Sequence, residues 1–316
     1  MQDNLQNKYI ELRVNRDFGD LITVYFDFLK QNLKKFTNVF LSYNGIFLIG
    51  LLLVSYLLVS GFVGLFAEGA DSFFDGDSSG KANYFILIGI GAFLFFVIFI
   101  VVALLNYSLA AGYLISYEEN EGNSFDKKEV WEFFKQRLGS IVIFVVLLIL
   151  IFVGYTVVSL MVMIIPFLGI FVNYTLQFFI MAWFGVSFFC MLRENKGVTE
   201  ALGEGWNLVI KSFWRAVGVN FILGLLNWLL FFIVMMVPGI ILGIYTYHIV
   251  QNEASNFASI VPTIIYTIGT CTVLIMYIYV QSLSQFVNGM LYYALHEKMY
   301  NTHTRSKIEQ IGNLDQ

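Results

Sequence analysis

Six long stretches of the chain contain almost only apolar residues, with no Asp, Glu, Lys or Arg away from their ends. They span about 45–66, 84–116, 140–165, 167–192, 217–248 and 256–295. A helix needs roughly 20 apolar residues to cross the hydrocarbon core of a bilayer, and every stretch meets that length. The pattern therefore predicts an all-α, polytopic membrane protein with six transmembrane helices.

Three polar stretches, near 20–41, 126–138 and 199–215, carry apolar residues at helical spacing and lead directly into an apolar run. Ser124 is the expected N-cap of the second. We interpret them as three cytoplasmic amphipathic helices, in the inner headgroup layer or packed under the bundle. The alternative is a docking face for a soluble partner. The residues that define their apolar faces are Phe28, Phe36, Phe134, Trp206 and Phe213.

The three amphipathic stretches also resemble one another. Residues 28–33 (FLKQNL) align with 133–138 (FFKQRL), and 209–214 (VIKSFW) matches more loosely. Each is followed by two apolar runs, so we predict a threefold repeat of helix plus hairpin, parallel about an axis near the membrane normal. The predicted organisation is a polar lead over 1–17, one membrane domain over 18–298 with repeat units 18–117, 124–193 and 198–298, and a cytoplasmic tail over 299–316.

Composition supports the membrane interpretation. The chain is 58% hydrophobic and 13% charged, with a mean hydropathy of +0.74, whereas a soluble domain carries about 25% charged residues. The net charge of −4 gives no reason to propose nucleic acid as a partner. The lipid bilayer is therefore the first partner that the sequence predicts.

The distribution of positive charge predicts the orientation. Of the 18 Lys and Arg residues, all except Lys81 lie in the lead, the tail and the loops on one side of the six predicted spans. Cytoplasmic loops carry the excess of Lys and Arg in membrane proteins. Both termini are therefore expected in the cytoplasm.

One segment, Glu200–Lys211 (EALGEGWNLVIK), resembles the A-L-x-x-S-W-x-L stretch of six-helix bacterial inner-membrane proteins of the YciC type. That group is related to the membrane domain of glycerophosphoryl diester phosphodiesterases. Val237-Pro238-Gly239 is similar to a Pro-Gly of the group, although there it usually precedes the A-L-x-x-S-W helix, and Gly205 stands where the group has Ser. The resemblance implies a bacterial inner-membrane location and little chemistry.

Residues that could support catalysis or metal binding are few. The topology places His248 outside and His296 and His303 inside, so they cannot share one site. Cys190 and Cys271 lie in apolar runs and have no metal-ligand spacing. We expect no enzymatic activity, no cofactor and no metal. The acidic outer segment 71–77 is interpreted as a solvated loop rather than a calcium site, because the closing Glu of a calcium loop is missing.

Polar residues inside the last run form the most specific candidate site. Amides that face lipid are costly, so these side chains are expected to point into the bundle, for interhelical hydrogen bonds or for a polar path. The candidate stripe comprises Gln281, Ser284, Gln285 and Asn288. In the fifth run, Pro238-Gly239 predicts a kink or break, and the four-residue spacing of Gly239 and Gly243 is typical of close helix packing.

Two functions remain open from the sequence. The first is a non-enzymatic membrane subunit that anchors or organises a larger inner-membrane assembly, with a protein partner at its cytoplasmic face. The second is a transporter or lipid-handling protein with a polar path along the sixth transmembrane helix. A water-filled cavity beside the polar stripe would favour the second.

Overall fold

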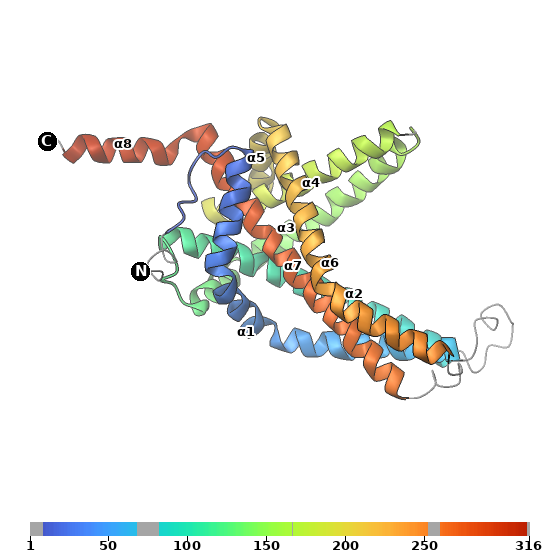
Figure 1. The fold of residues 1–316 in the computed structure, drawn as a ribbon. Helices are drawn as coiled ribbons and strands as arrows, with labels where there is room; N and C mark the ends of the chain where they lie inside the picture. The colour runs from blue at the N-terminus through green and yellow to red at the C-terminus, as the bar shows by residue number, and fades with distance from the viewer. Residues whose placement is uncertain (1–8, 68–81, 166, 252–259, 315–316) are drawn as a thin grey trace. The chain divides into compact units, whose positions relative to one another are not determined.

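The computed structural model describes residues 9–67, 82–165, 167–251 and 260–314, which are mostly helical and contain no strand. Six helices in this part are long and apolar enough to cross a membrane, which confirms the predicted all-α polytopic architecture. The helices are α1 (Phe18–Ala67), α2 (Ala82–Glu119), α3 (Lys127–Val162), α4 (Leu168–Glu194), α5 (Val198–Ile210), α6 (Phe213–Gln251), α7 (Ile260–Tyr300) and α8 (Thr302–Leu314) (Figure 1).

Two of the predicted amphipathic stretches are continuous with the apolar run that follows. Helix α1 contains both the stretch near 20–41 and the first apolar run, and α3 combines its two parts in the same way. Only α5 ends before the next helix, where the Ser212 N–H donates to the Val209 carbonyl at 3.1 Å. The threefold repeat itself stays a prediction.

The start of α3 corrects one expectation. Its N-cap is Asp126 rather than Ser124. The Asp126 carboxylate accepts a hydrogen bond from the Lys127 N–H at 2.7 Å, and the Asp126 N–H donates to Glu129 Oε1 at 2.9 Å. This reciprocal arrangement is a capping box, which satisfies N–H groups that have no partner within the helix.

Helix α6 corrects two further expectations from the sequence. It continues from Phe213 to Gln251 through Pro238, so the predicted break does not occur. The spacing of Gly239 and Gly243 also makes no close helix contact, because a Cβ built on either would meet nothing within 4 Å.

The chain divides into two compact units. The first comprises Met1–Val39, Leu104–Asn227 and Ser282–Gln316, and the second Phe40–Ala103 and Trp228–Gln281. Every Asp, Glu, Lys and Arg that the structure describes belongs to the first unit. We call the first the charge-bearing unit and the second the charge-free unit, a name that refers to its described residues alone. Helices α1, α2, α6 and α7 each contribute one part to each unit.

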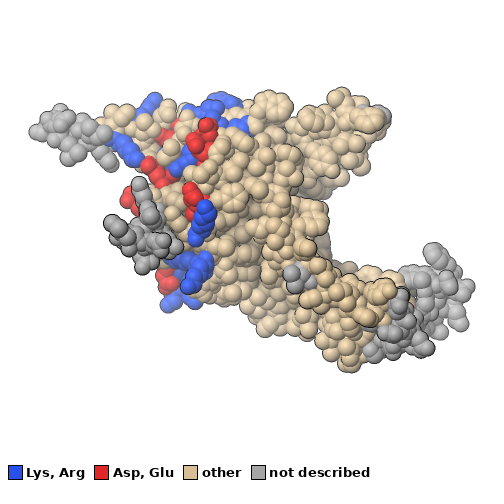
Figure 2. Space-filling model, in the orientation of Figure 1, with Lys and Arg blue, Asp and Glu red and all other residues tan. Residues whose placement is uncertain are grey.

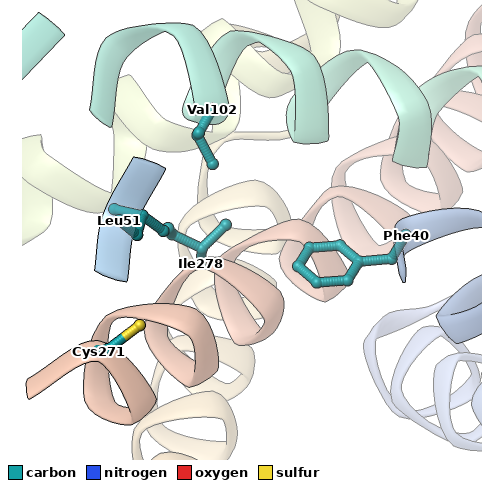
Figure 3. Close-up of a cluster of buried hydrophobic side chains, with 5 residues drawn as sticks. All are labelled: Phe40, Leu51, Val102, Cys271 and Ile278. Carbon is teal, nitrogen blue, oxygen red and sulfur yellow. The ribbon is translucent and has the colours of Figure 1, made fainter. Parts of the chain in front are cut away.

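The charge-free unit is held by apolar packing. Its buried cluster draws on α1, α2 and α7, and Leu51 and Ile278 point toward each other (Figure 3). The Tyr277 ring contacts Phe99 at 6.4 Å and Phe231 at 6.1 Å, which connects α7 to α2 and α6. The cluster consists of Phe40, Leu51, Val102, Cys271 and Ile278.

Aromatic rings form the core of the charge-bearing unit. Phe286 lies 5.0 Å from Phe28 and 4.8 Å from Phe36, between ring centroids. Tyr113 contacts Phe36 at 5.5 Å, and its hydroxyl donates to Asn32 Oδ1 at 3.0 Å. The apolar face predicted for the start of α1 is therefore buried against α2 and α7.

Two close contacts complete this unit. In the α3–α4 hairpin, which Figure 1 shows side by side, Asn173 Oδ1 accepts from Tyr155 at 3.0 Å and from Ser159 at 2.6 Å. Helix α5 lies directly on α4, since a Cβ on Gly205 would come within 2.8 Å of the Ser187 backbone. Absence of a side chain at Gly205 permits this approach.

Candidate functional site

The charged residues of the charge-bearing unit gather where the N-terminal lead meets the last turns of α2, α4 and α7. Figure 2 shows Lys, Arg, Asp and Glu together in this region, with none coloured over the outer part of the α3–α4 hairpin. The lead is fixed there by Leu12, which is fully buried, and by the Ile10 N–H, which donates to the Tyr117 hydroxyl at 2.9 Å. The sequence thus brings a polar segment under the ends of apolar helices.

Glu118 connects three of these segments. Its Oε1 lies 2.5 Å from Arg13 Nε in the lead, and its Oε2 lies 3.0 Å from Arg193 Nε at the end of α4. The Tyr293 hydroxyl of α7 donates to the same Oε2 at 3.5 Å. The Glu118 side chain is only 9% exposed. Two guanidinium groups therefore share one buried carboxylate, a charge-assisted arrangement.

Glu194, the last residue of α4, forms a second group of contacts. Its Oε1 accepts from the Tyr292 hydroxyl at 2.7 Å and lies 3.6 Å from His296 Nε2. Its Oε2 lies 2.7 Å from Lys196 Nζ, which is also 3.9 Å from Glu204 Oε2. Here one ammonium group is shared by two carboxylates.

Two titratable groups beside these contacts have shifted pKa values. Burial lowers the pKa of Lys196, but its hydrogen bond with Glu194 and the charges of Glu194 and Glu204 outweigh burial, so the pKa is raised. Burial and the negative charge of Glu118 raise the pKa of Tyr9 to about 12. Lys196 therefore remains charged and Tyr9 neutral at neutral pH.

Glu297 organises the start of α8. Its Oε2 accepts the His303 N–H at 3.0 Å, and its Oε1 accepts the Thr304 N–H at 2.9 Å and the Thr304 hydroxyl at 2.8 Å. A carboxylate at a helix N-terminus satisfies free N–H groups and complements the helix dipole. These hydrogen bonds fix the start of α8 to the end of α7, and Asn301, with a left-handed backbone, joins the two helices.

The lead also contacts α8. Glu11 Oε1 lies 2.6 Å from Lys307 Nζ and 3.0 Å from His303 Nδ1, and the same His303 nitrogen lies 3.2 Å from the Arg13 carbonyl oxygen. These contacts hold the N-terminal lead against α8, although the two segments are almost 300 positions apart in the chain.

A cavity of about 260 Å³ lies among these groups. The Tyr292 and Tyr293 rings contact each other at 5.1 Å, and Tyr292 contacts the His296 ring at 5.6 Å. Charged and aromatic groups therefore share the wall. The lining residues are Arg13, Arg193, Glu194, Tyr292, Tyr293, His296 and Glu297.

The structure buries part of the predicted polar stripe of α7. Gln285 is fully buried, Asn288 is 5% exposed and Ser284 is half-buried, whereas Gln281, also expected to point inward, is exposed. Gln281 is the first of the four along the helix and belongs to the charge-free unit, whereas the other three belong to the charge-bearing unit. The side chains of one predicted stripe therefore have different surroundings.

Two buried amides of the stripe contain polar atoms without a hydrogen bond. Neither amide atom of Gln285, nor Asn288 Oδ1, makes one to the part of the chain that the structure describes. The Tyr107 hydroxyl interacts with Gln285 without reaching that geometry. The Asn288 side chain packs on α4, where Gly185 provides the space. Unsatisfied polar groups at such depth indicate a place for water or another polar species.

The other candidate residues lie on the faces of amphipathic stretches. Phe28 and Phe36 are fully buried and Phe134 is 8% exposed. Phe213 is half-buried, and Trp206 is 39% exposed while its ring contacts Phe179 at 5.1 Å. These side chains pack mostly within the protein, so their role as a docking face stays a prediction.

The sequence pattern missed the cavity residues. One signal was available: Gln285, Asn288, Tyr292 and His296 follow one another at intervals of three, four and four, which places them on one face of α7. Tyr292 and His296 extend the polar face of Gln285 and Asn288 toward the end of α7. No signal marked Arg13 or Glu118, whose pairing depends on tertiary structure.

The described residues contain no group of three or more His, Cys, Asp or Glu that could hold a metal ion. Cys190 and Cys271 are buried and free. The acidic segment 71–77, with its alternative calcium interpretation, lies outside the described residues. No protein-family model, curated protein or solved structure matches this chain.

Proposed function

We propose that this chain is a non-enzymatic integral membrane subunit that anchors or organises a larger assembly, with a protein partner that binds at α8. The observation that carries the proposal is α8. Its described side chains are exposed except for the half-buried His303, yet the helix is held in place by Glu297 and Glu11. A 13-residue helix alone is marginal in water. A helix that is fixed at its start, with every described side chain from Thr304 to Glu309 exposed, is suited to insertion into a groove of a partner.

The location is part of the same proposal. The charge distribution and the resemblance to the YciC-type group support a bacterial inner membrane with both termini in the cytoplasm. Labelling of cysteine variants in intact cells tests this orientation. Arg305→Cys is expected to react only after the membrane is permeabilised, and Ser78→Cys before it. The opposite pattern would reject the orientation. The native cysteines are buried, which limits background labelling.

A photo-crosslinking amino acid at Ile308 tests the partner. Ile308 is 63% exposed on α8, and Phe93, 67% exposed in the charge-free unit, is a matched control. We expect one discrete heteromeric product from Ile308 and none from Phe93. The product should be lost in Arg305→Glu, which changes an exposed α8 charge while leaving Glu297 and Glu11 intact. Equal products from both positions, or no effect of Arg305→Glu, would reject the proposal.

A polar path along α7 is the second candidate, favoured by the buried Gln285 amide and Asn288 Oδ1, which make no hydrogen bond to the described residues. If these groups serve a path, Gln285→Leu should abolish transport of the substrate while the protein still inserts and folds. If they serve only packing, the same variant should keep full function. Solvent accessibility of Asn288→Cys in the membrane-embedded protein gives an independent measurement, because a path requires water at this position.

A further inference from the structure

The charged side chains at and beside the cavity form two separate groups of ion pairs, which we call its two corners. At one corner, Arg13 and Arg193 share the Glu118 carboxylate, which leaves one positive charge in excess. At the other, Glu194 and Glu204 share the Lys196 ammonium group, which leaves one negative charge in excess. Glu119, which also contacts Arg193, is 49% exposed and therefore largely screened by solvent.

The first corner offers hydrogen-bond donors to a ligand, and the second offers acceptors. Arg13 has five N–H donors, and its contact with Glu118 is an ion pair through Nε without hydrogen-bond geometry. Arg13 lines the cavity together with Tyr293 and His296 and interacts electrostatically with both. Glu297 also lines the cavity, but both its oxygens accept hydrogen bonds from α8. Each Glu297 oxygen accepts two hydrogen bonds, which fills its lone pairs. Glu194 accepts one from Tyr292 through Oε1 and pairs with Lys196 through Oε2, so each of its oxygens keeps a lone pair for a bound cation.

We propose that this cavity binds a small zwitterion, with a phosphate or carboxylate group at Arg13 and Arg193 and a primary ammonium group at Glu194. Guanidinium groups bind oxyanions in planar, charge-assisted hydrogen bonds. The Tyr292 ring and the Glu194 carboxylate would bind the ammonium group, since cations are attracted to both. Pockets for drug-sized ligands occupy roughly 300–1,000 Å³, so a cavity of about 260 Å³ suits a small polar molecule. This binding site is independent of the proposed assembly role.

Phosphoethanolamine is the probe that carries both groups. Full-length protein in phosphatidylcholine nanodiscs should show a saturable rise in thermal stability with phosphoethanolamine at constant ionic strength. Inorganic phosphate and ethanolamine, each carrying one of the two charges, should bind at least about tenfold more weakly, which corresponds to the loss of one charged contact. The same chemistry occurs in the headgroup of phosphatidylethanolamine. Nanodiscs of that lipid without soluble probe should therefore stabilise the protein if the ligand is a lipid.

Two variants assign the corners. Arg13→Lys keeps a positive charge beside Glu118 but loses the planar donors, and should weaken phosphate binding while leaving ethanolamine binding unchanged. Glu194→Gln keeps an acceptor for Tyr292 and should do the reverse. Arg305→Lys and Glu309→Gln, on exposed parts of α8, are the matched controls and should bind like the unaltered protein.

Either source of the zwitterion supports the proposal, and the two nanodisc preparations distinguish them. Absence of stabilisation by both phosphoethanolamine and phosphatidylethanolamine would overturn it. So would equal responses of the cavity variants and the α8 controls. Each response is measured against the ligand-free stability of the same variant, so a general loss of stability cannot imitate the predicted selectivity.

Discussion

The two units of this protein are built partly from the same helices but are stabilised by different interactions. Residues 18–39 of α1 carry five charged side chains and pack into an aromatic core with hydrogen bonds, whereas residues 40–67 carry none and pack through apolar contacts. In lipid, apolar side chains gain little by leaving their surroundings, because the acyl chains are equally apolar. The specific packing of helices against one another therefore depends on complementary side-chain shapes in the charge-free unit. In the charge-bearing unit it depends on shared polar contacts.

The largest expected effect comes from Glu118→Gln. Removal of this charge leaves Arg13 and Arg193 without their shared counter-ion. Breaking a buried ion pair costs about 3–5 kcal/mol, and because both arginine side chains are partly exposed we expect a loss of about 3 kcal/mol in the free energy of unfolding, measured in detergent. Glu119→Gln, at an exposed residue, should cost less than about 1 kcal/mol. Equal losses at the two residues would show that the buried Glu118 contacts contribute no more than an exposed ion pair.

Gly205→Ala should have the next largest effect. A Cβ at Gly205 would approach the Ser187 backbone to 2.8 Å and force α5 away from α4. Overpacking costs typically about 1–3 kcal/mol, which exceeds the gain of about 1 kcal/mol in helix propensity. We expect a loss of about 2 kcal/mol by thermal unfolding.

Glycines without close neighbours are the controls for that prediction. Gly203→Ala in the same helix and Gly243→Ala in the charge-free unit meet nothing within 4 Å. Both should stabilise the protein by up to about 1 kcal/mol. A loss at Gly243 similar to that at Gly205 would mean that the charge-free unit also depends on a close glycine contact.

Leu51→Ala tests the shape of the charge-free core. Leu51 is fully buried in the cluster with Phe40, Val102, Cys271 and Ile278. Leu→Ala changes in soluble cores cost about 2–5 kcal/mol, but part of that value is transfer from water, which is largely absent in a bilayer. We therefore expect about 1–2 kcal/mol in a chemical unfolding experiment. Leu53→Ala, 62% exposed in the same helix, should be nearly neutral.

The smallest expected effect is that of Gln285→Leu. The buried amide makes no hydrogen bond to the described residues, so its replacement by an apolar side chain removes an unsatisfied group. The free energy of unfolding should rise or remain within about 1 kcal/mol. Asn173→Leu is the comparison, because Asn173 accepts hydrogen bonds from Tyr155 and Ser159 and should lose about 1 kcal/mol. A large loss at Gln285 would indicate that ordered water completes its hydrogen bonds.

The sequence was sufficient for the six long helices and for the burial of several predicted faces. Apolar length is a local property, since a helix satisfies its own backbone groups and needs no distant partner. The same locality explains the burial of Phe28, Phe36 and Phe134, which follows from helical spacing. The ends of helices were harder to predict from the sequence. Both Ser124 and Asp126 are good N-cap residues, but only Asp126 has a Glu three residues later, Glu129, to complete a capping box.

The charged cluster, the cavity and the division into two units were decided by tertiary structure. Arg13, Glu118 and Arg193 are far apart in the sequence, and no local pattern distinguishes a paired arginine from a solvated one. Gln281 and Gln285 share a helical face, yet Gln281 is exposed and Gln285 is fully buried. Periodicity determines which side chains share a face, whereas the neighbouring helices determine what that face contacts.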